Sequence, residues 1–248
     1  MNDHSSNTAA RTDPPMESRR HTDQQYEREL TALREKLLFM GAKVEEALAD
    51  AMRAFEQKDI VLAQRVIDQD REINRLEIAI DGDCLSLLAR RAPVASDLRF
   101  LTMTLKIVTD LERIGDIAVN IGERVVGFAA DPPRLTWPAV TQMGITVRSM
   151  LKDALDAFVA ADVAKARWVI EQDRSVDSAY ASVFHEVLLV MMEDRSAVQR
   201  GMGIQAIAKY LERVGDHATN LAEFVVFLAK GTDIRHFKGS AEEPGSSA

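Results

Sequence analysis

The sequence has little of what sheet-rich, disulfide-stabilised or nucleic-acid-binding proteins require. Aromatic residues make up 6% of the 248 residues and glycines number only 12, which favours helices packed through aliphatic side chains. The single cysteine, Cys84, excludes an intramolecular disulfide and suits a reducing compartment. The formal net charge of −8, with no concentrated basic stripe, argues against a nucleic-acid partner.

Long apolar runs and common enzyme motifs are missing as well. The sequence contains no uncharged apolar stretch of about 18 residues and no apolar signal core near its first residue. We therefore expect a cytoplasmic protein whose membrane association is at most peripheral. It also lacks a glycine-rich phosphate loop, a Gly-x-Ser-x-Gly turn and a His-Glu-x-x-His helix, so it shows no catalytic residue of those classes.

Helical patterns separated by short breaks fill the chain between two polar ends. Residues 1–23 and 239–248 have almost nothing to bury, and we predict that they are disordered tails. Between them the breaks define six helices of about 25 to 35 residues. Residues able to accept hydrogen bonds from first-turn amides, and so to cap helices, stand at four breaks: Asp59, Ser96, Asp162 and Ser196.

An internal repeat organises these helices into two halves. The segment 66–71 recurs 103 positions later as 169–174, and the segment 111–116 recurs 100 positions later as 211–216. The repeats share Asp, Glu, Asn and Gly positions and not merely the phase of their apolar residues, which indicates duplication. The predicted fold is all-α: two tandem antiparallel three-helix bundles at residues 24–131 and 134–236, divided near Pro132-Pro133.

Acidic residues gather on one face of the third helix of each repeat. Over residues 105–126, apolar residues such as Ile107, Leu111 and Ile114 occupy the inward side. A narrow sector on the other side holds Glu112, Asp116, Asn120 and Glu123, and the second repeat matches it with Glu212, Asp216, Asn220 and Glu223. Like charges four residues apart repel, so conservation of this spacing between the two copies favours a function over a merely solvated face.

The preceding helix of each repeat adds oxygen ligands at the same level. In an antiparallel hairpin turning near Pro93, Asp70 and Asn74 lie beside Asp116 and Glu112. A hairpin turning near Asp194 places Asp173 and Asp177 beside Asp216 and Glu212 in the same way. Facing carboxylates are costly unless protons or cations compensate them. Oxygen ligands favour Mg²⁺, Mn²⁺, Ca²⁺ or iron, and no Cys/His cluster indicates zinc. The predicted metal ligands are Glu112, Asp116, Glu212, Asp216, Asp70, Asp173, Asp177, Asn120 and Asn220.

Two sequence signatures resemble those of the phosphate uptake regulator (PhoU) family. The first comprises Asp97-Leu98-Arg99, residues 111–116 and Asn120, and the second covers residues 210–220. The resemblance extends over residues 26 to about 230. It implies two three-helix bundles that bind metal clusters through paired Glu/Asp-x-x-x-Asp motifs, mapped here onto Glu112, Asp116, Glu212 and Asp216.

The same resemblance implies a function and partners. A member of the family is expected to repress the phosphate-starvation response by contacting the ATPase subunit of the phosphate ABC transporter and the phosphate-sensing histidine kinase. Homodimers are common among similar proteins. The chain departs from the family pattern where Asn74 replaces an acid, and where the second repeat has no counterpart of Asp97-Leu98-Arg99. We therefore expect the two repeats to differ in function.

Two alternatives to a metal-loaded regulatory adaptor remain open from the sequence. One is a carboxylate-bridged metalloenzyme such as a phosphatase using two adjacent cations. The other is a purely structural helical interaction module with solvated acidic faces. Hydrolysis of phosphoesters would favour the first, and the absence of any bound cation would favour the second.

Overall fold

The structure is a computed structural model that describes residues 16–91, 93, 95–128 and 136–231. This part of the chain forms six α-helices and one 3₁₀ turn. The helices are α1 (Met16–Gln57), α2 (Ile60–Arg91), α3 (Ala95–Gly127), α4 (Pro138–Ala160), α5 (Val163–Glu193) and α6 (Val198–Lys230), with the 3₁₀ turn η1 (Arg195–Ala197) between α5 and α6. The all-α prediction is confirmed.

The helix ends agree with most of the predicted breaks. α1 begins at Met16, inside the segment 1–23 expected to be a tail, and at 42 residues it is longer than predicted. α4, with 23 residues, is slightly shorter than the predicted range. Residues 1–15, the proline pair at 132–133 and the tail predicted at 239–248 lie outside the described residues.

Two of the four predicted helix caps are present. Asp59 accepts the amide of Leu62 at 2.9 Å, and Asp162 accepts the amides of Ala164 and Lys165. The predictions for the two serines were wrong. Ser96 lies inside the first turn of α3, and Ser196 lies in η1, where Asp194 accepts its amide at 2.8 Å. The aspartate two residues earlier therefore supplies the cap predicted for Ser196.

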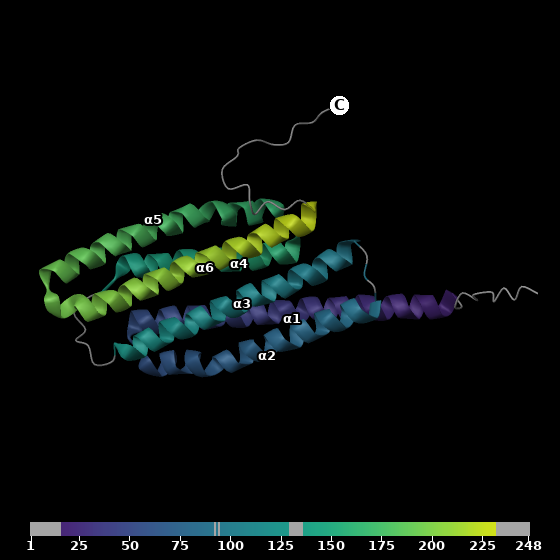
Figure 1. Ribbon diagram of the computed structural model, residues 1–248, viewed down its shortest axis with the longest axis horizontal. Helices are drawn as coiled ribbons and strands as arrows, with labels where there is room; N and C mark the ends of the chain where they lie inside the picture. The colour runs from purple at the N-terminus through teal and green to yellow at the C-terminus, as the bar shows by residue number, and fades with distance from the viewer. Residues whose placement is uncertain (1–15, 92, 94, 129–135, 232–248) are drawn as a thin grey trace, which may run out of the picture.

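The six helices form two three-helix bundles that lie side by side (Figure 1). α1, α2 and α3 contact one another, and so do α4, α5 and α6. The bundles meet where α1 contacts α4 and α3 contacts α6, so α2 and α5 lie at opposite outer edges. α3 and α6 run antiparallel, since Phe128 at the end of α3 packs against Gly203 near the start of α6.

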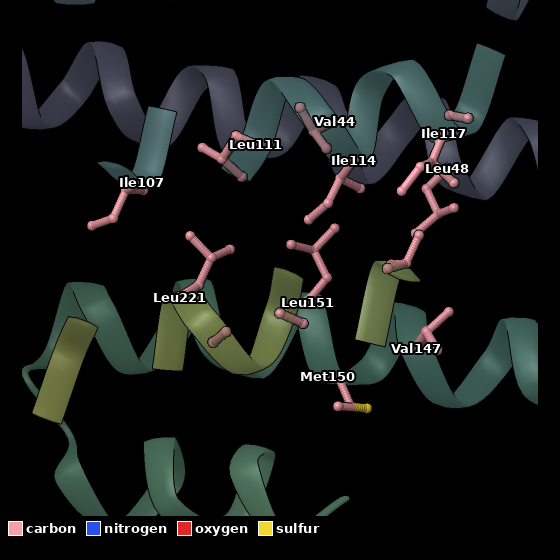
Figure 2. Close-up of a cluster of buried hydrophobic side chains, with 14 of the residues drawn as sticks. Val44, Leu48, Ile107, Leu111, Ile114, Ile117, Val147, Met150, Leu151 and Leu221 are labelled. Atoms are coloured by element: carbon pink, nitrogen blue, oxygen red, sulfur yellow. The ribbon is translucent and has the colours of Figure 1, made fainter. Parts of the chain in front are cut away.

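One hydrophobic core extends through both bundles. Ile114 of α3 and Leu151 of α4 are fully buried and point toward each other across the interface between the bundles, with Val44 and Leu48 of α1 nearby (Figure 2). The same cluster of buried residues continues into α2 and α5. The repeats are therefore halves of one packed unit and not two independently buried cores.

Equivalent glycines in the first helix of each repeat allow α1 and α4 to approach closely. A Cβ atom at Gly41 would lie 2.8 Å from Cδ2 of Leu155, and one at Gly144 would overlap the side chain of Met52. Because real Cβ atoms do not approach side chains this closely, each glycine admits a large apolar residue from the opposite bundle.

None of the described helices is both long enough and apolar enough to cross a lipid bilayer.

Replacing Ile114 with Ala should destabilise the whole described core in a single step. Ile114 is fully buried between the bundles, so truncation should lower the free energy of unfolding by about 2–5 kcal/mol. Urea unfolding followed by circular dichroism should show one shifted transition. Ile78→Ala, at a residue 71% exposed on α2, is the matched control and should stay within about 0.5 kcal/mol of the wild type. Two separate transitions, of which only one moves, would contradict a shared core.

Candidate functional site

The α2–α3 acidic seam is a set of side chains that line the groove between these two helices: Asp70, Asn74, Glu77 and Asp81 from α2, and Glu112 and Asp116 from α3. The predicted hairpin register is correct, because a Cβ at Gly115 would lie 3.1 Å from the side chain of Ile73. Asp70 and Asn74 are thereby level with Asp116 and Glu112, as the sequence predicted.

Glu112 is the carboxylate of the seam whose pKa is affected by the largest number of neighbouring charges. Its side chain is only 16% exposed. Burial raises its pKa above the ordinary value, and the charges of Asp116, Glu77 and Asp70 raise it further, against the lowering effect of Arg113. The charged form of Glu112 is therefore disfavoured in the folded protein unless a cation compensates it.

Asp70 and Asn74 form a hydrogen-bonded pair that keeps two oxygens unpartnered. The amide nitrogen of Asn74 donates to Oδ2 of Asp70 at 2.8 Å. Burial raises the pKa of Asp70, the Asn74 hydrogen bond lowers it, and the charge of Asp116 raises it again. Oδ1 of Asp70 and Oδ1 of Asn74 are both buried without a hydrogen-bond partner. Burying an unpartnered oxygen costs free energy of folding, and such oxygens are typical of a site that lacks its donor or cation.

Glu77 and Asp81 belong to the same seam and were not predicted. Burial raises the pKa of Glu77, and the charges of Asp81 and Asp116 raise it further, whereas Arg113 lowers it. Burial also raises the pKa of Asp81. A signal for them was available in the sequence, since Asp70, Asn74, Glu77 and Asp81 follow one another at intervals of four, three and four residues on one helix face.

Arg113 is the cation that partly balances the seam. Its Nε lies 3.5 Å from Oε2 of Glu112, and its Nη1 lies 3.5 Å from Oδ2 of Asp116. Its side chain is 53% exposed, so these contacts contribute little. Five carboxylates share the seam with this one exposed guanidinium, and negative charge remains in excess.

The α5–α6 acidic seam of the second repeat comprises Asp173 and Asp177 from α5 and Glu212 and Asp216 from α6. Its negative charge is better compensated than that of the first seam. Here Lys209 donates to Oε1 of Glu212 at 2.7 Å, and this hydrogen bond raises the pKa of Lys209. The hydroxyl of Thr219 lies 3.4 Å from Oδ1 of Asp173, while Asp177 and Asp216 are exposed. Position 109 in the first repeat is a threonine, so the lysine is present in one seam alone and the two seams differ in charge.

Three residues near the predicted ligands form a polar bridge between the bundles. Nδ1 of His217 lies 2.7 Å from Oδ1 of Asp110, and the amide of Asn220 donates to the same oxygen at 3.3 Å. The sequence placed Asn220 among the metal ligands, but its nitrogen is turned toward α3. The equivalent Asn120 instead donates to the backbone carbonyl of Asp116 at 2.8 Å.

The last pair of the predicted acidic sectors is not equivalent in the two repeats. Glu123 is exposed to solvent, whereas Glu223 is only 5% exposed. The sequence repeat placed both glutamates on one outward sector. Packing separates them because the environments of α3 and α6 differ even where their residues match.

The donor chemistry of the α2–α3 seam fits a hard cation. Carboxylate and amide oxygens are suitable ligands for Mg²⁺, Mn²⁺, Ca²⁺ or iron, and two of these oxygens lack any other partner. Among the described residues, no group of three or more His, Cys, Asp or Glu side chains is gathered tightly enough to hold an ion as the side chains stand. Ligation would require these side chains to turn inward.

Comparisons with known proteins agree on one family. The PhoU domain model matches residues 37–125 and again residues 140–225. The chain is 41% identical over 218 residues to a phosphate-specific transport system accessory protein PhoU homolog from Pseudomonas putida, covering 87% of this chain and 85% of the relative. A homolog of the same name from Pseudomonas aeruginosa is 42% identical, with 87% and 90% covered. The crystal structure of PhoU from Pseudomonas aeruginosa superposes with a TM-score of 0.81 at 40% identity, covering 84% of this chain and all of that one.

The raised pKa of Glu112 predicts how stability depends on pH in metal-free protein. A carboxyl group whose pKa is raised on folding contributes stability below its unfolded pKa and loses it as the pH rises through the folded pKa. In the presence of a chelator, Glu112→Gln should therefore match the wild type near pH ~4 and be more stable than it at pH ~7. Urea unfolding at both pH values measures this. Glu35→Gln, at an exposed residue, is the control, and an equal effect of the two variants would contradict the electrostatic origin.

Proposed function

The chain belongs to the PhoU family, whose members are accessory regulatory proteins and not enzymes, and on this premise we propose that it regulates phosphate uptake as a metal-binding adaptor. The duplicated PhoU match over both bundles supports the regulatory role. The assignment to this family decides against the phosphatase alternative. The proposed site of action is the cytoplasmic side of the membrane, next to the phosphate transporter.

The excess charge of the α2–α3 seam is the observation that supports metal binding. Asp70, Glu77, Glu112 and Asp116 would hold the ion, with the unpartnered Oδ1 of Asn74 beside them. A bound divalent or trivalent cation would supply the positive charge that one exposed Arg113 does not. Since these ligands come from two helices, binding would tie α2 to α3 and relieve the repulsion described above.

The α5–α6 seam is the weaker of the two proposed metal sites. Glu212 already accepts a hydrogen bond from Lys209, so a cation at this seam must displace the lysine or share the carboxylate with it. At the first site Asn74 stands in place of an acid and would remove one negative charge, and the lysine at the second site opposes metal binding more strongly. We propose that the two seams bind metal with different affinities.

Partner docking has a candidate surface at the turn between α5 and α6. Five large apolar side chains are exposed there: Leu188, Leu189, Met192, Val198 and Met202. Exposed apolar residues gathered at one end of a protein mark interaction sites more often than isolated ones do. Met192 is 74% and Met202 is 66% exposed there, whereas Met150 is buried in the core.

The proposed partners are the ATPase subunit of the phosphate transporter and the phosphate-sensing histidine kinase, together with a second copy of this chain. An adaptor transmits a signal only if its affinity for a partner differs between phosphate-rich and phosphate-poor states, by about 1–3 kcal/mol in typical coupled systems. Metal loading of the α2–α3 seam would contribute to that difference by fixing the spacing of α2 and α3.

Neutralising the four principal ligands should abolish metal retention while the helices persist. We expect the variant Glu112→Gln, Asp116→Asn, Glu212→Gln, Asp216→Asn to lose the ions that the wild type retains after loading with Mn²⁺ or iron and desalting, because its central ligands lose their charge. Elemental analysis measures retention, and circular dichroism measures helicity. The matched control neutralises four exposed acids outside the seams: Glu35, Asp68, Glu171 and Glu193. Full retention by the ligand variant would show that the ligands lie elsewhere.

Deleting the gene should induce phosphate-acquisition genes in phosphate-rich medium, because a repressor of the starvation response is removed. Transcript levels of the phosphate transporter genes measure this, and reintroducing the wild-type gene should restore repression. Reintroducing the ligand variant separates the roles: restored repression would make metal binding dispensable for regulation. Normal repression in the deletion strain would contradict the regulatory function itself.

A further inference from the structure

The apolar patch at the turn between α5 and α6 is built from two rows of exposed side chains. Phe184, which is 46% exposed one helical turn before Leu188, extends the patch along α5. Phe184, Leu188 and Met192 follow one another at intervals of four residues and form the first row. Val198 and Met202, also four residues apart, form the second row at the start of α6.

The two rows are ridges against which a third helix can pack. α5 and α6 approach closely beside the patch, since a Cβ atom at Gly201 would lie 2.6 Å from Cγ of Met191 and 3.2 Å from Cγ1 of Val187. Side chains spaced four residues apart are the ridges through which packed helices interlock. Two such ridges on adjacent helices therefore suit an amphipathic helix, which presents its own apolar residues at intervals of three and four.

The patch belongs to the second repeat alone. The offsets of 103 and 100 residues between the repeats give its six positions these counterparts on α2 and α3: Asp81, Leu85, Ser86, Ala89, Leu98 and Thr102. Only Leu85 and Leu98 among them are large and apolar. The fold of the repeat therefore does not require exposed apolar residues at these positions, and their presence on α5 and α6 favours a binding surface.

Carboxylates outnumber cations at the rim of the patch. Glu186 and Glu193 lie beside it on α5, Asp194 follows at the turn, and Arg195 in η1 is the cation among them. The hydrogen bonds from Ser196 lower the pKa of Asp194, so this carboxylate stays charged at neutral pH. Three carboxylates thus share the rim with one guanidinium.

The negative rim selects among possible occupants. The cations further along α6 do not change it, because Lys209 is hydrogen-bonded to Glu212 and Arg200 lines a pocket on a different side of the helix. Two copies of the patch facing each other would bring like charges together, and an anionic lipid surface would be repelled. A helix that carries lysine or arginine beside its apolar residues would be attracted.

We propose that the patch binds a basic amphipathic helix of a partner protein, whose large apolar residues pack against the two rows and whose lysines or arginines face Glu186, Glu193 and Asp194. The inference rests on the proposed adaptor function and names the class of partner segment that its docking surface takes. Met192 and Met202 suit this role, because unbranched thioether side chains adapt to apolar surfaces of different shape.

The probe for this surface is a fluorescein-labelled peptide of about 15 residues, with leucines at intervals of three and four and lysines at the other positions. We expect saturable binding to the full chain by fluorescence anisotropy, in the presence of a chelator. A peptide of the same composition whose order breaks the apolar face should bind about tenfold more weakly, and so should one with glutamates in place of the lysines. Equal binding of either control peptide would overturn the proposal.

Substitutions in the protein locate the binding site. Met192→Lys and Met202→Lys each place a like charge among the apolar contacts and should weaken binding of the leucine–lysine peptide about tenfold, with unchanged circular dichroism. Leu85→Lys is the matched control, since Leu85 is 60% exposed and is the counterpart of Leu188 in the first repeat. It adds the same charge and should bind the peptide like the wild type. An equal loss in the control would assign binding to overall charge and overturn the proposal.

Two other occupants of the patch would give different results. A wild-type dimer that Met202→Lys converts to a monomer in sedimentation velocity would assign the patch to a second copy of this chain. Cosedimentation with vesicles of phosphatidylcholine and phosphatidylserine, lost in Met202→Lys, would assign it to a lipid surface. Either result would overturn the proposal.

Complementation of the deletion strain separates this proposal from the adaptor function on which it rests. We expect Leu85→Lys to restore repression of the phosphate-acquisition genes and Met202→Lys to fail. Repression restored by Met202→Lys would overturn the docking site and leave the adaptor function intact. Normal repression in the deletion strain itself would contradict the adaptor function, whichever peptide the protein binds.

Discussion

The interface between the two bundles is the constraint on which the rest of the structure depends. Ile114 and Leu151 meet there in a core that is continuous from one repeat to the other, and the glycines at positions 41 and 144 allow α1 and α4 to approach. Because α1, α3, α4 and α6 share this contact, α2 and α5 are left at the outer edges. Each outer helix then forms a seam with the third helix of its own repeat, and the acidic residues line these seams.

Burial and charge oppose each other in the α2–α3 seam. The apolar residues of α3 hold the helix against the core, so Glu112 on its other side is brought against α2 and loses contact with water. The carboxylates of Asp70, Glu77 and Asp116 surround it, which raises the pKa of Glu112 and stores unfavourable electrostatic energy in the metal-free fold. Folding energy from the shared core offsets this cost.

The two repeats have kept the same fold but not the same electrostatics. Lys209 compensates Glu212, whereas the corresponding Thr109 leaves Glu112 without a lysine. Asp110, His217 and Asn220 join the bundles through polar contacts, and their equivalents in the other repeat, Tyr210, Ile117 and Asn120, form no matching bridge between α3 and α6 among the described residues. A pocket of about 490 Å³ between the repeats is likewise lined by unlike elements, the ends of α1 and α3 from the first repeat and the starts of α4 and α6 from the second. A duplicated unit thus presents two surfaces that differ in charge and polar contacts.

The sequence by itself determined the helices, their pairing and the identity of the central carboxylates, because apolar periodicity and the repeated Glu-x-x-x-Asp spacing are local properties of the chain. Tertiary structure alone decided that the repeats share one core, that Glu223 is buried while Glu123 is exposed, and that Asn220 turns toward Asp110. These features depend on which faces of α3 and α6 meet, and that choice follows from the summed packing of all six helices. Glu77 and Asp81 lie between the two cases, since their spacing was readable but their burial against α3 was not.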